Sequence, residues 1–577
     1  MLPPAPGAQT DQQSSASAGA DAAQRSVRHR RWLTAALLLL ASLPAVGGLV
    51  GLWLDRDRPY VPLGDHALFE MVVRDVADHE LLLGVYSRFG WYHPGPLGTY
   101  LLAIPYHLSG GAPEAMSAGA LVIAGTSTVA AVWLVRQSAG LLAGAFALLV
   151  ITESVRVMGD GFIRDTWNPY VPVLPFLVGV LLCWTALRGE PWALPLAVVP
   201  MSLAVQAHIG FIPPVGAVVV ALIAGLLLRG GQHLWRRWKR ADGTEPDVGP
   251  ARFLRWLLAT VAALAVAVLL WLPPIKQQLT DEPGNIDGLI DYMQRSPSET
   301  AGLSAGIRRV FDQFGALLLR VTDASISTEA AASVGLATFA VALVVGTLRR
   351  RTDVLWLGFL TLAVGAAGVA AVARIEGPPY DYITQWASVV GMLAWITVGI
   401  SLLPELLLGV RRTVTRQRAG ARSEAVVGLP LAALATVTVV FAAIGTARAA
   451  TPATEISGQV DGLARAVVAD LDRRGLHDGE DVVVRVDFAP TSRPDLLGTF
   501  LPGAGVVGEL VRDGIDVQLD DFWTLQFGER YTERADDAGY VVTVAYSDGT
   551  SPPPEAWQQV LAAGDEFQVY GGVPPAS

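Results

Sequence analysis

Residues 54–111 read LDRDRPYVPLGDHALFEMVVRDVADHELLLGVYSRFGWYHPGPLGTYLLAIPYHLSGG and separate the first long apolar segment of the chain from the second. A connection of this length between apolar segments is unusual, and long connections with helical patterns of their own usually carry function. The charged residues and histidines of this loop lie among amphipathic and aromatic residues: Asp55, Asp57, Asp65, His66, Glu70, Arg74, Asp75, Arg88 and His93. We therefore expect a functional site in this loop, with Asp65 as a catalytic base.

The composition places the chain among polytopic membrane proteins. Its 577 residues are 52% hydrophobic and 16% charged, with a mean hydropathy of +0.42, which is too apolar for an ordinary soluble protein. The single cysteine, Cys183, excludes a disulfide within the chain. Residues 451–577 hold 22 Asp and Glu against 8 Lys and Arg. An acidic tail after a mildly basic apolar part argues against nucleic acid as a partner.

Apolar segments long enough to cross a bilayer recur along the chain. We count about eleven, with a margin of two: 32–54, 114–135, 140–151, 170–187, 192–206, 212–228, 256–272, 331–348, 355–372, 383–403 and 426–444. The first follows a basic lead-in, residues 1–31, which we expect to be disordered and cytoplasmic. A cleaved signal peptide is the alternative for this segment, because Ala41 and Ala45 are small.

The charges of the connections give an independent test of this count. Alternate connections hold the basic residues: Arg136, Arg188, the run 229–255, Arg349 to Arg351, and the run 411–422. The opposite set, which includes the loop 55–113, is richer in Asp, Glu, Tyr and Pro, as expected when basic loops stay in the cytoplasm. The sequence thus predicts a multi-pass cell-membrane protein with a transmembrane domain over 32–447. An odd number of spans places residues 448–577 outside the cell.

Residues 448–577 have the pattern of a small α/β domain. Helices are expected at 455–474, 495–512 and 554–563, and strands at 481–488, 515–519, 540–546 and 567–570. Strands that alternate with helices favour a parallel or mixed sheet. No G-x-G-x-x-G motif follows any of these strands, so a dinucleotide site has no support.

Asp65 opens a helical pattern over 67–76 whose apolar residues share one face, which suits a helix at a membrane surface. A carboxylate is favoured at a helix N-terminus by the dipole and by free N–H groups. A helix cap is therefore one interpretation of Asp65. Its place in the first long loop, shortly after the first apolar segment, favours the other interpretation, a general base.

The order of elements around Asp65 resembles that of a known superfamily. A short basic N-terminus, one span, a loop that opens with an acidic residue, the motif W-x-H-P-G-P-L-x-x-Y-L and a later R-D before a proline-broken span are similar to the GT-C glycosyltransferases, which use polyprenyl-phosphate sugars. These include protein O-mannosyltransferases, aminoarabinose transferases and actinobacterial arabinofuranosyltransferases. The matching residues, within about 32–208, are Asp65, Trp91, His93, Pro94, Pro96, Leu97, Arg164 and Asp165. The O-mannosyltransferases carry an Asp-Glu pair, whereas His66 follows Asp65 here, so the acceptor class stays open.

The resemblance implies transfer of a sugar from a polyprenyl-phosphate carrier to an extracytoplasmic glycan, lipid or protein. Because a phosphate is a good leaving group, such a displacement needs one base, Asp65, and no separate general acid, unlike the carboxylate pair of glycosidases. Arginine binds phosphate oxygens in two-point fashion, so Arg88 and Arg164 are candidates to bind the donor, together with His93 and Asp165. The other interpretation of both arginines is contact with surface groups or lipid headgroups.

Further residues are candidates to line a cavity around this site: Glu70, Trp91, Tyr92, Gln206, His208 and Tyr382. Aromatic residues can instead form an interfacial belt, and polar groups at membrane depth can be structural hydrogen-bonding groups. The carboxylates of the later connections have no spacing that requires a cation. We therefore expect no metal and no cofactor.

Two other classes of protein compete with a glycosyltransferase. One is a transporter or flippase of lipid-linked glycans, which in the common repeat type shows paired interrupted spans in two related halves; the sequence has no such pairing. The other is a non-catalytic membrane scaffold with a glycan-binding outer domain, which would tolerate loss of Asp65. The sugar, the acceptor and the oligomeric state are not determined by the sequence.

Overall fold

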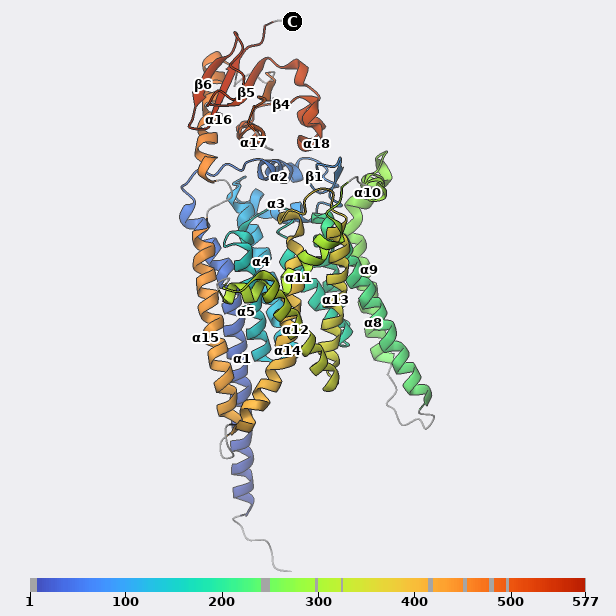
Figure 1. The fold of residues 1–577 in the computed structure, drawn as a ribbon. Helices are drawn as coiled ribbons and strands as arrows, with labels where there is room; N and C mark the ends of the chain where they lie inside the picture. Colours follow the sequence, from blue (N-terminus) through green and yellow to red (C-terminus); the bar gives the residue numbers. More distant parts are fainter. Residues whose placement is uncertain are drawn as a thin grey trace, which may run out of the picture.

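The computed structural model describes residues 8–239, 250–295, 299–322, 325–413, 419–449, 454–476, 482–493 and 498–575. It shows a bundle of long helices with a C-terminal domain at one end (Figure 1). The helices are α1 Ala8–Asp55, α2 Asp65–Arg74, α3 Leu97–Leu108, α4 Glu114–Ala139, α5 Leu141–Met158, α6 Val173–Leu187, α7 Ala193–Ala207, α8 Ile212–Lys239, α9 Pro250–Thr280, α10 Asn285–Gln294, α11 Gly302–Val321, α12 Thr328–Leu348, α13 Thr352–Ala373, α14 Ser388–Thr413, α15 Ala419–Arg448, α16 Thr454–Arg474, α17 Phe500–Arg512 and α18 Thr524–Phe527. The strands are β1 Tyr86–Ser87, β2 Trp91–Tyr92, β3 Val484–Phe488, β4 Val517–Gln518, β5 Tyr540–Tyr546, β6 Gln559–Ala563 and β7 Phe567–Gly572.

The helical bundle has the composition of a membrane domain. Among the described residues, nine helices are long and apolar enough to cross a membrane, and α6 and α7 are shorter apolar helices. These eleven helices follow the eleven expected apolar segments in order, from α1 to α15. The prediction of a polytopic helical membrane protein is confirmed.

The first and last spans, α1 and α15, lie side by side (Figure 1). A Cβ on Gly47 or Gly51 of α1 would lie 2.4 or 2.3 Å from the carbonyl oxygen of Ala443 or Ala447 of α15. Small residues at such a contact let two membrane helices approach closely. This pairing brings the loop after α1 and the domain after α15 to the same end of the bundle.

Two segments contain more helix than the sequence analysis expects. Helix α1 begins at Ala8, inside the lead-in for which we expected disorder, and residues 1–7 lie outside the described part. The alanines and glutamines of this lead-in favour helix. The long connection before α12 contains α10 and α11, and α11 packs against the bundle: a Cβ on Gly315 would lie 2.4 Å from the backbone nitrogen of Ala332.

The C-terminal domain contains a five-stranded sheet of order β4-β3-β5-β7-β6. Strand β3 is parallel to β4 and β5, and β7 is antiparallel to β5 and β6, so the sheet is mixed, as expected. The helix expected at 554–563 is wrong, because residues Gln559–Ala563 form the edge strand β6. Its pairing with β7 overrides the local preference of an alanine- and glutamine-containing segment for helix.

Helix α2 is packed into the core of the C-terminal domain. Leu68 and Met71 share one buried apolar cluster with residues of α16, α17 and the sheet. The backbone N–H of Gly64 donates to the carbonyl oxygen of Leu501 at 3.0 Å. The buried apolar face of α2 therefore packs against protein, and its first residue, Asp65, lies at the junction of the bundle and the domain.

Candidate functional site

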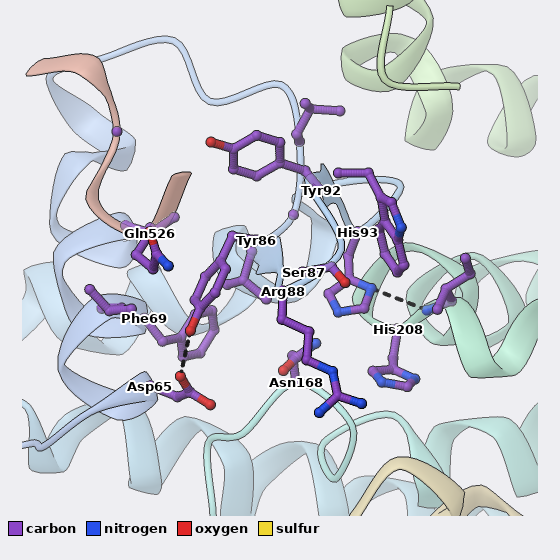
Figure 2. Close-up of a pocket in the computed structure, with 18 of the residues that line it drawn as sticks. Asp65, Phe69, Tyr86, Ser87, Arg88, Tyr92, His93, Asn168, His208 and Gln526 are labelled. Carbon is purple, nitrogen blue, oxygen red and sulfur yellow. Dashed lines mark hydrogen bonds between the residues drawn. The ribbon is translucent and has the colours of Figure 1, made fainter. Parts of the chain in front are cut away.

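A cavity of about 970 Å³ lies where the helical bundle meets the C-terminal domain. Residues from α2, the β1–β2 hairpin, the connections that precede α6 and α8, and α9, α10 and α18 line it. Figure 2 shows part of this lining. Segments that are more than 450 positions apart in the sequence thus share one cavity, from Asp65 to Tyr531.

Asp65 lines this cavity at the start of α2. Gly64 is the N-cap residue, with φ of 50°, a conformation that glycine adopts without strain. No side chain caps the helix, so the interpretation of Asp65 as a helix cap is not supported. Its carboxylate instead accepts a hydrogen bond from Tyr86 Oη at 2.9 Å (Figure 2). Burial and the charge of Asp65 raise the pKa of Tyr86, which keeps its hydroxyl protonated as a donor.

His66 connects Asp65 to the R-D motif, a link that the sequence analysis did not foresee. Its Nε2 lies 2.9 Å from Asp165 Oδ1, which also accepts the backbone N–H of Trp167 at 2.8 Å. Burial opposes protonation of His66, but the hydrogen bond with Asp165 and the negative charges of Asp165 and Asp65 raise its pKa above 6.5. Asp165 does not itself line the cavity, whereas Trp167 and Asn168, two and three residues later, do.

Arg88 lies at the tip of the β1–β2 hairpin and lines the cavity. Figure 2 shows its side chain extending toward the space between Asn168 and His208. Its guanidinium contacts the Phe89 ring, with 4.9 Å between Cζ and the ring centroid. No ion pair joins Arg88 to a carboxylate in the described part of the chain, so its charge is available to an anion in the cavity.

Two buried histidines, His93 and His208, line the other end of the cavity, with ring centroids 4.8 Å apart. The backbone N–H of Ile209 donates to His93 Nδ1 at 3.2 Å, and that of Gly210 donates to His208 Nδ1 at 3.1 Å. Burial lowers the pKa of both rings below 6.5, so both are neutral at pH 7. Because each Nδ1 accepts, each ring carries its proton on Nε2, as a donor.

Besides Asp165, three residues expected at the site lie outside the cavity lining. Arg164 is fully buried and donates to the carbonyl oxygens of Thr446 and Ala449, which satisfies acceptors at the end of α15. The Gln206 side chain bridges the backbone of the bundle, accepting from Leu97 N–H at 3.2 Å and donating to Leu270 at 2.8 Å. The third is Glu70, whose two carboxylate oxygens accept from Arg512 Nη2 at 2.9 and 2.7 Å.

Other expected residues do line the cavity: Trp91, Tyr92 and Tyr382. The ring of Tyr382 stacks on Trp167 at 4.6 Å, and the backbone N–H of Tyr92 donates to Asn285 Oδ1 at 2.9 Å. The sequence analysis missed Asn168, which follows the R-D motif closely, and the lining residues 523–531. The aromatic segment DFWTLQFGERY, at 521–531 in an acidic tail, is the sequence feature that would have indicated the latter.

The described residues contain no group of three or more His, Cys, Asp or Glu side chains placed to hold a metal ion.

No family model and no curated protein matches the chain. The solved structure of ArnT from Cupriavidus metallidurans in the apo state aligns with 94% of this chain and 98% of that one, with a TM-score of 0.51 at 13% sequence identity. The chain has the fold of ArnT. A second structure of the same ArnT, bound to undecaprenyl phosphate, also aligns with 94% of this chain and 98% of that one, with a TM-score of 0.49 at 14% identity.

The ArnT fold covers both parts of the molecule, because the alignment with apo ArnT spans almost the whole chain. The resemblance noted in the sequence reached only to about residue 208. The structural similarity to ArnT therefore extends through α8 to α15 and into the C-terminal domain, where no sequence motif indicated a resemblance.

Proposed function

We propose that this protein is a membrane glycosyltransferase that moves a sugar from a polyprenyl-phosphate carrier to an extracytoplasmic acceptor. The observation that carries the proposal is that Asp65 and Arg88, a carboxylate and a cation with no ion pair among the described residues, line the same cavity at one end of a bundle with the ArnT fold. The reaction needs this combination, since one group must take a proton and another must receive a phosphate.

Asp65 is the general base of the proposed reaction. Its carboxylate takes the proton of an acceptor hydroxyl, the acceptor oxygen forms a bond to the anomeric carbon, and the bond from that carbon to the phosphate oxygen breaks. The hydrogen bond from Tyr86 to Asp65 Oδ1 fixes the carboxylate in one orientation. General-base assistance contributes typically about 10²–10⁴-fold to a rate, so Asp65 accounts for a large share of the catalysis.

Arg88 binds the leaving phosphate in this proposal. Its planar guanidinium can donate two parallel hydrogen bonds to phosphate oxygens. The Nε2–H groups of the neutral His93 and His208 add donors that carry no charge. Donors held by the fold stabilise the charge that develops on the leaving group without reorganising during the step.

The site faces the outside of the cell, and the chain has its N-terminus in the cytoplasm. The distribution of basic residues over alternate connections supports this orientation. A reporter enzyme fused after Thr451 should be active outside the membrane, whereas activity in the cytoplasm would contradict the orientation.

The function is tested by supplying purified protein in nanodiscs with radiolabelled polyprenyl-phosphate sugars, among them mannose, arabinose and galactose donors, and a cell-envelope fraction as acceptor. We expect one donor to lose its label to the acceptor as polyprenyl phosphate is released. In proteoliposomes, movement of intact donor across the bilayer with no transfer of label would instead identify a flippase.

A further inference from the structure

Three side chains of the cavity lining have a buried polar atom that no protein group satisfies among the described residues: Trp91 Nε1, Gln526 Oε1 and Tyr531 Oη. Buried polar atoms in folded proteins nearly always have a hydrogen-bond partner, so each such atom in a cavity calls for an explanation. Two of the three, Gln526 and Tyr531, come from the C-terminal domain. Only 5% of the Tyr531 surface is exposed, so its hydroxyl is held inside the wall.

Gln526 and Tyr531 lie on the same segment as Trp523, whose indole is packed between other aromatic rings. Trp523 lines the cavity and stacks on Phe500, with ring centroids 5.3 Å apart and an interplanar angle of 12°. Phe527 packs edge-on against the same indole. Binding sites for small molecules combine such aromatic surface with a few polar groups that fix orientation.

The chemistry of these atoms selects the class of ligand. Gln526 Oε1 can only accept a hydrogen bond, whereas Tyr531 Oη can donate and accept. A hydroxyl group serves both, and a sugar offers several hydroxyls together with an apolar ring face that packs on an indole. A purely apolar ligand would leave both atoms without a hydrogen bond, which would weaken its binding.

The position of this segment relates it to the base. Figure 2 shows Gln526 on the side of the cavity where Phe69, Tyr86 and Asp65 lie, apart from His93 and His208. Tyr86, which donates to Asp65, packs against the apolar cluster of the C-terminal domain. A ligand bound at Gln526 is therefore at the end of the cavity opposite the histidines.

We propose that Trp523, Gln526 and Tyr531 form the acceptor subsite, and that the acceptor is a carbohydrate. This inference rests on the proposed function, because it assigns the second substrate of the same cavity. The phosphate of the donor lies at the Arg88 and histidine end, and a sugar hydroxyl of the acceptor lies beside Asp65.

The test uses the full chain in nanodiscs and two variants that remove the polar atoms while keeping side-chain size, Gln526→Met and Tyr531→Phe, combined in one protein. Phe522→Ala is the matched control, since Phe522 is the neighbour of Trp523 but is 73% exposed and does not line the cavity. Binding is measured on an array of immobilised saccharides that covers hexoses, pentoses and amino sugars, followed by titration of the tightest saccharide. Undecaprenyl phosphate is titrated in parallel as the probe of the donor end.

We expect the wild type and Phe522→Ala to bind a saccharide equally and the double variant to bind it at least tenfold more weakly, with undecaprenyl phosphate affinity unchanged in all three. Equal saccharide binding by the double variant and the wild type, as when water satisfies the two atoms, overturns the subsite, and so does a wild type that binds no saccharide on the array. Saccharide binding through Gln526 and Tyr531 without any sugar transfer refutes the proposed function alone. Transfer with an unchanged acceptor KM in the double variant refutes the subsite alone.

Discussion

The two walls of the cavity differ in how their polar groups are held. On the membrane-side wall, formed by Asp65, Arg88, His93, Asn168 and His208, both histidines and Asp65 have hydrogen-bond partners that fix their orientation. On the domain wall, formed by Trp523, Gln526, Phe527 and Tyr531, aromatic rings dominate and two polar atoms have no partner among the described residues, against one such atom, Trp91 Nε1, on the other wall. The comparison indicates that groups for the chemistry are preorganised in the membrane-side wall, while the domain wall keeps hydrogen-bonding capacity for a substrate.

An ion pair joins α2 to the C-terminal domain behind the cavity lining, and breaking it should have the largest effect. Arg512 of α17 lies 2.7 Å from Glu70 of α2 and also contacts Glu509, and Glu70 is only 3% exposed. Arg512→Met leaves Glu70 buried and unpaired, which costs about 3–5 kcal/mol in comparable cases. We expect a large fall in the thermal unfolding temperature, measured by intrinsic fluorescence in detergent.

Two controls separate this effect from a general loss of surface charge. Arg534→Met breaks the exposed pair with Asp516 and should change stability by less than about 1 kcal/mol. Combining Arg512→Met with Glu70→Met removes both buried charges and should recover part of the loss. An Arg512→Met protein as stable as the wild type would show that this ion pair does not stabilise the junction of α2 with the C-terminal domain.

The membrane-side wall should lose stability in acid because of His208. Its pKa is about 4 in the folded protein against 6.5 for an exposed histidine, since burial disfavours the charged ring. Between about pH 6.5 and pH 4 this histidine is protonated in the unfolded chain but neutral in the folded one. The free energy of unfolding therefore decreases by up to about 3 kcal/mol as the pH falls through this range. His66, with a raised pKa, acts in the opposite sense: its contribution is present below pH 6.5 and lost as pH rises through its folded value.

His208→Asn isolates the first contribution, because an asparagine oxygen can still accept the Gly210 N–H that His208 accepts. We expect the unfolding temperature of this variant to fall less steeply than that of the wild type between pH 7 and pH 4.5. Parallel curves for the two proteins would contradict a neutral, buried His208.

Arg88 should be required for binding the carrier phosphate. Hydrogen bonds to charged groups are worth about 1.5–3 kcal/mol, so Arg88→Gln should weaken the binding of undecaprenyl phosphate about 10–100-fold. Arg88→Lys keeps the charge but loses the two-point geometry. Its affinity for undecaprenyl phosphate should therefore lie between that of the wild type and that of Arg88→Gln. Isothermal titration in nanodiscs measures the affinities, and an unchanged affinity for Arg88→Gln would place the phosphate elsewhere.

The smallest effect is expected at the arginine of the domain wall. Arg530 also lines the cavity, but its Nη1 lies 3.0 Å from Asp75 Oδ1, so a carboxylate of the protein already compensates its charge. Arg530→Gln should leave the affinity for undecaprenyl phosphate unchanged, because the Arg530 guanidinium is already engaged by Asp75 rather than by the phosphate. A loss as large as that of Arg88→Gln would mean that the phosphate contacts both walls.

The sequence predicted much of the membrane-side wall, because three of its five residues, Asp65, Arg88 and His93, lie within a single loop. The apolar lengths gave the eleven helices, and Asp65, Arg88 and His93 do line one cavity. Arg164 and Gln206 looked equally suitable in the sequence, yet their partners are backbone atoms of helices far along the chain. A single sequence does not show which polar residue has such a partner.

The domain wall was beyond sequence analysis for a related reason. The alternation of expected strands and helices over 448–577 predicted an α/β domain. It did not predict that side chains of 523–531 would share a cavity with a loop more than 400 positions earlier. The edge strand β6, expected as a helix, shows the same limit, since only its pairing with β7 makes it a strand. Contacts over such distances depend on the packing of α1 with α15 and of α2 with the domain.

The most direct test of the account is the turnover of Asp65→Asn with the donor that the wild type uses. We expect the rate of sugar transfer to fall by about 10²–10⁴-fold, because an amide cannot take the acceptor proton, while the affinity for undecaprenyl phosphate stays that of the wild type. Transfer by Asp65→Asn at the wild-type rate would contradict the assignment of Asp65 as the base.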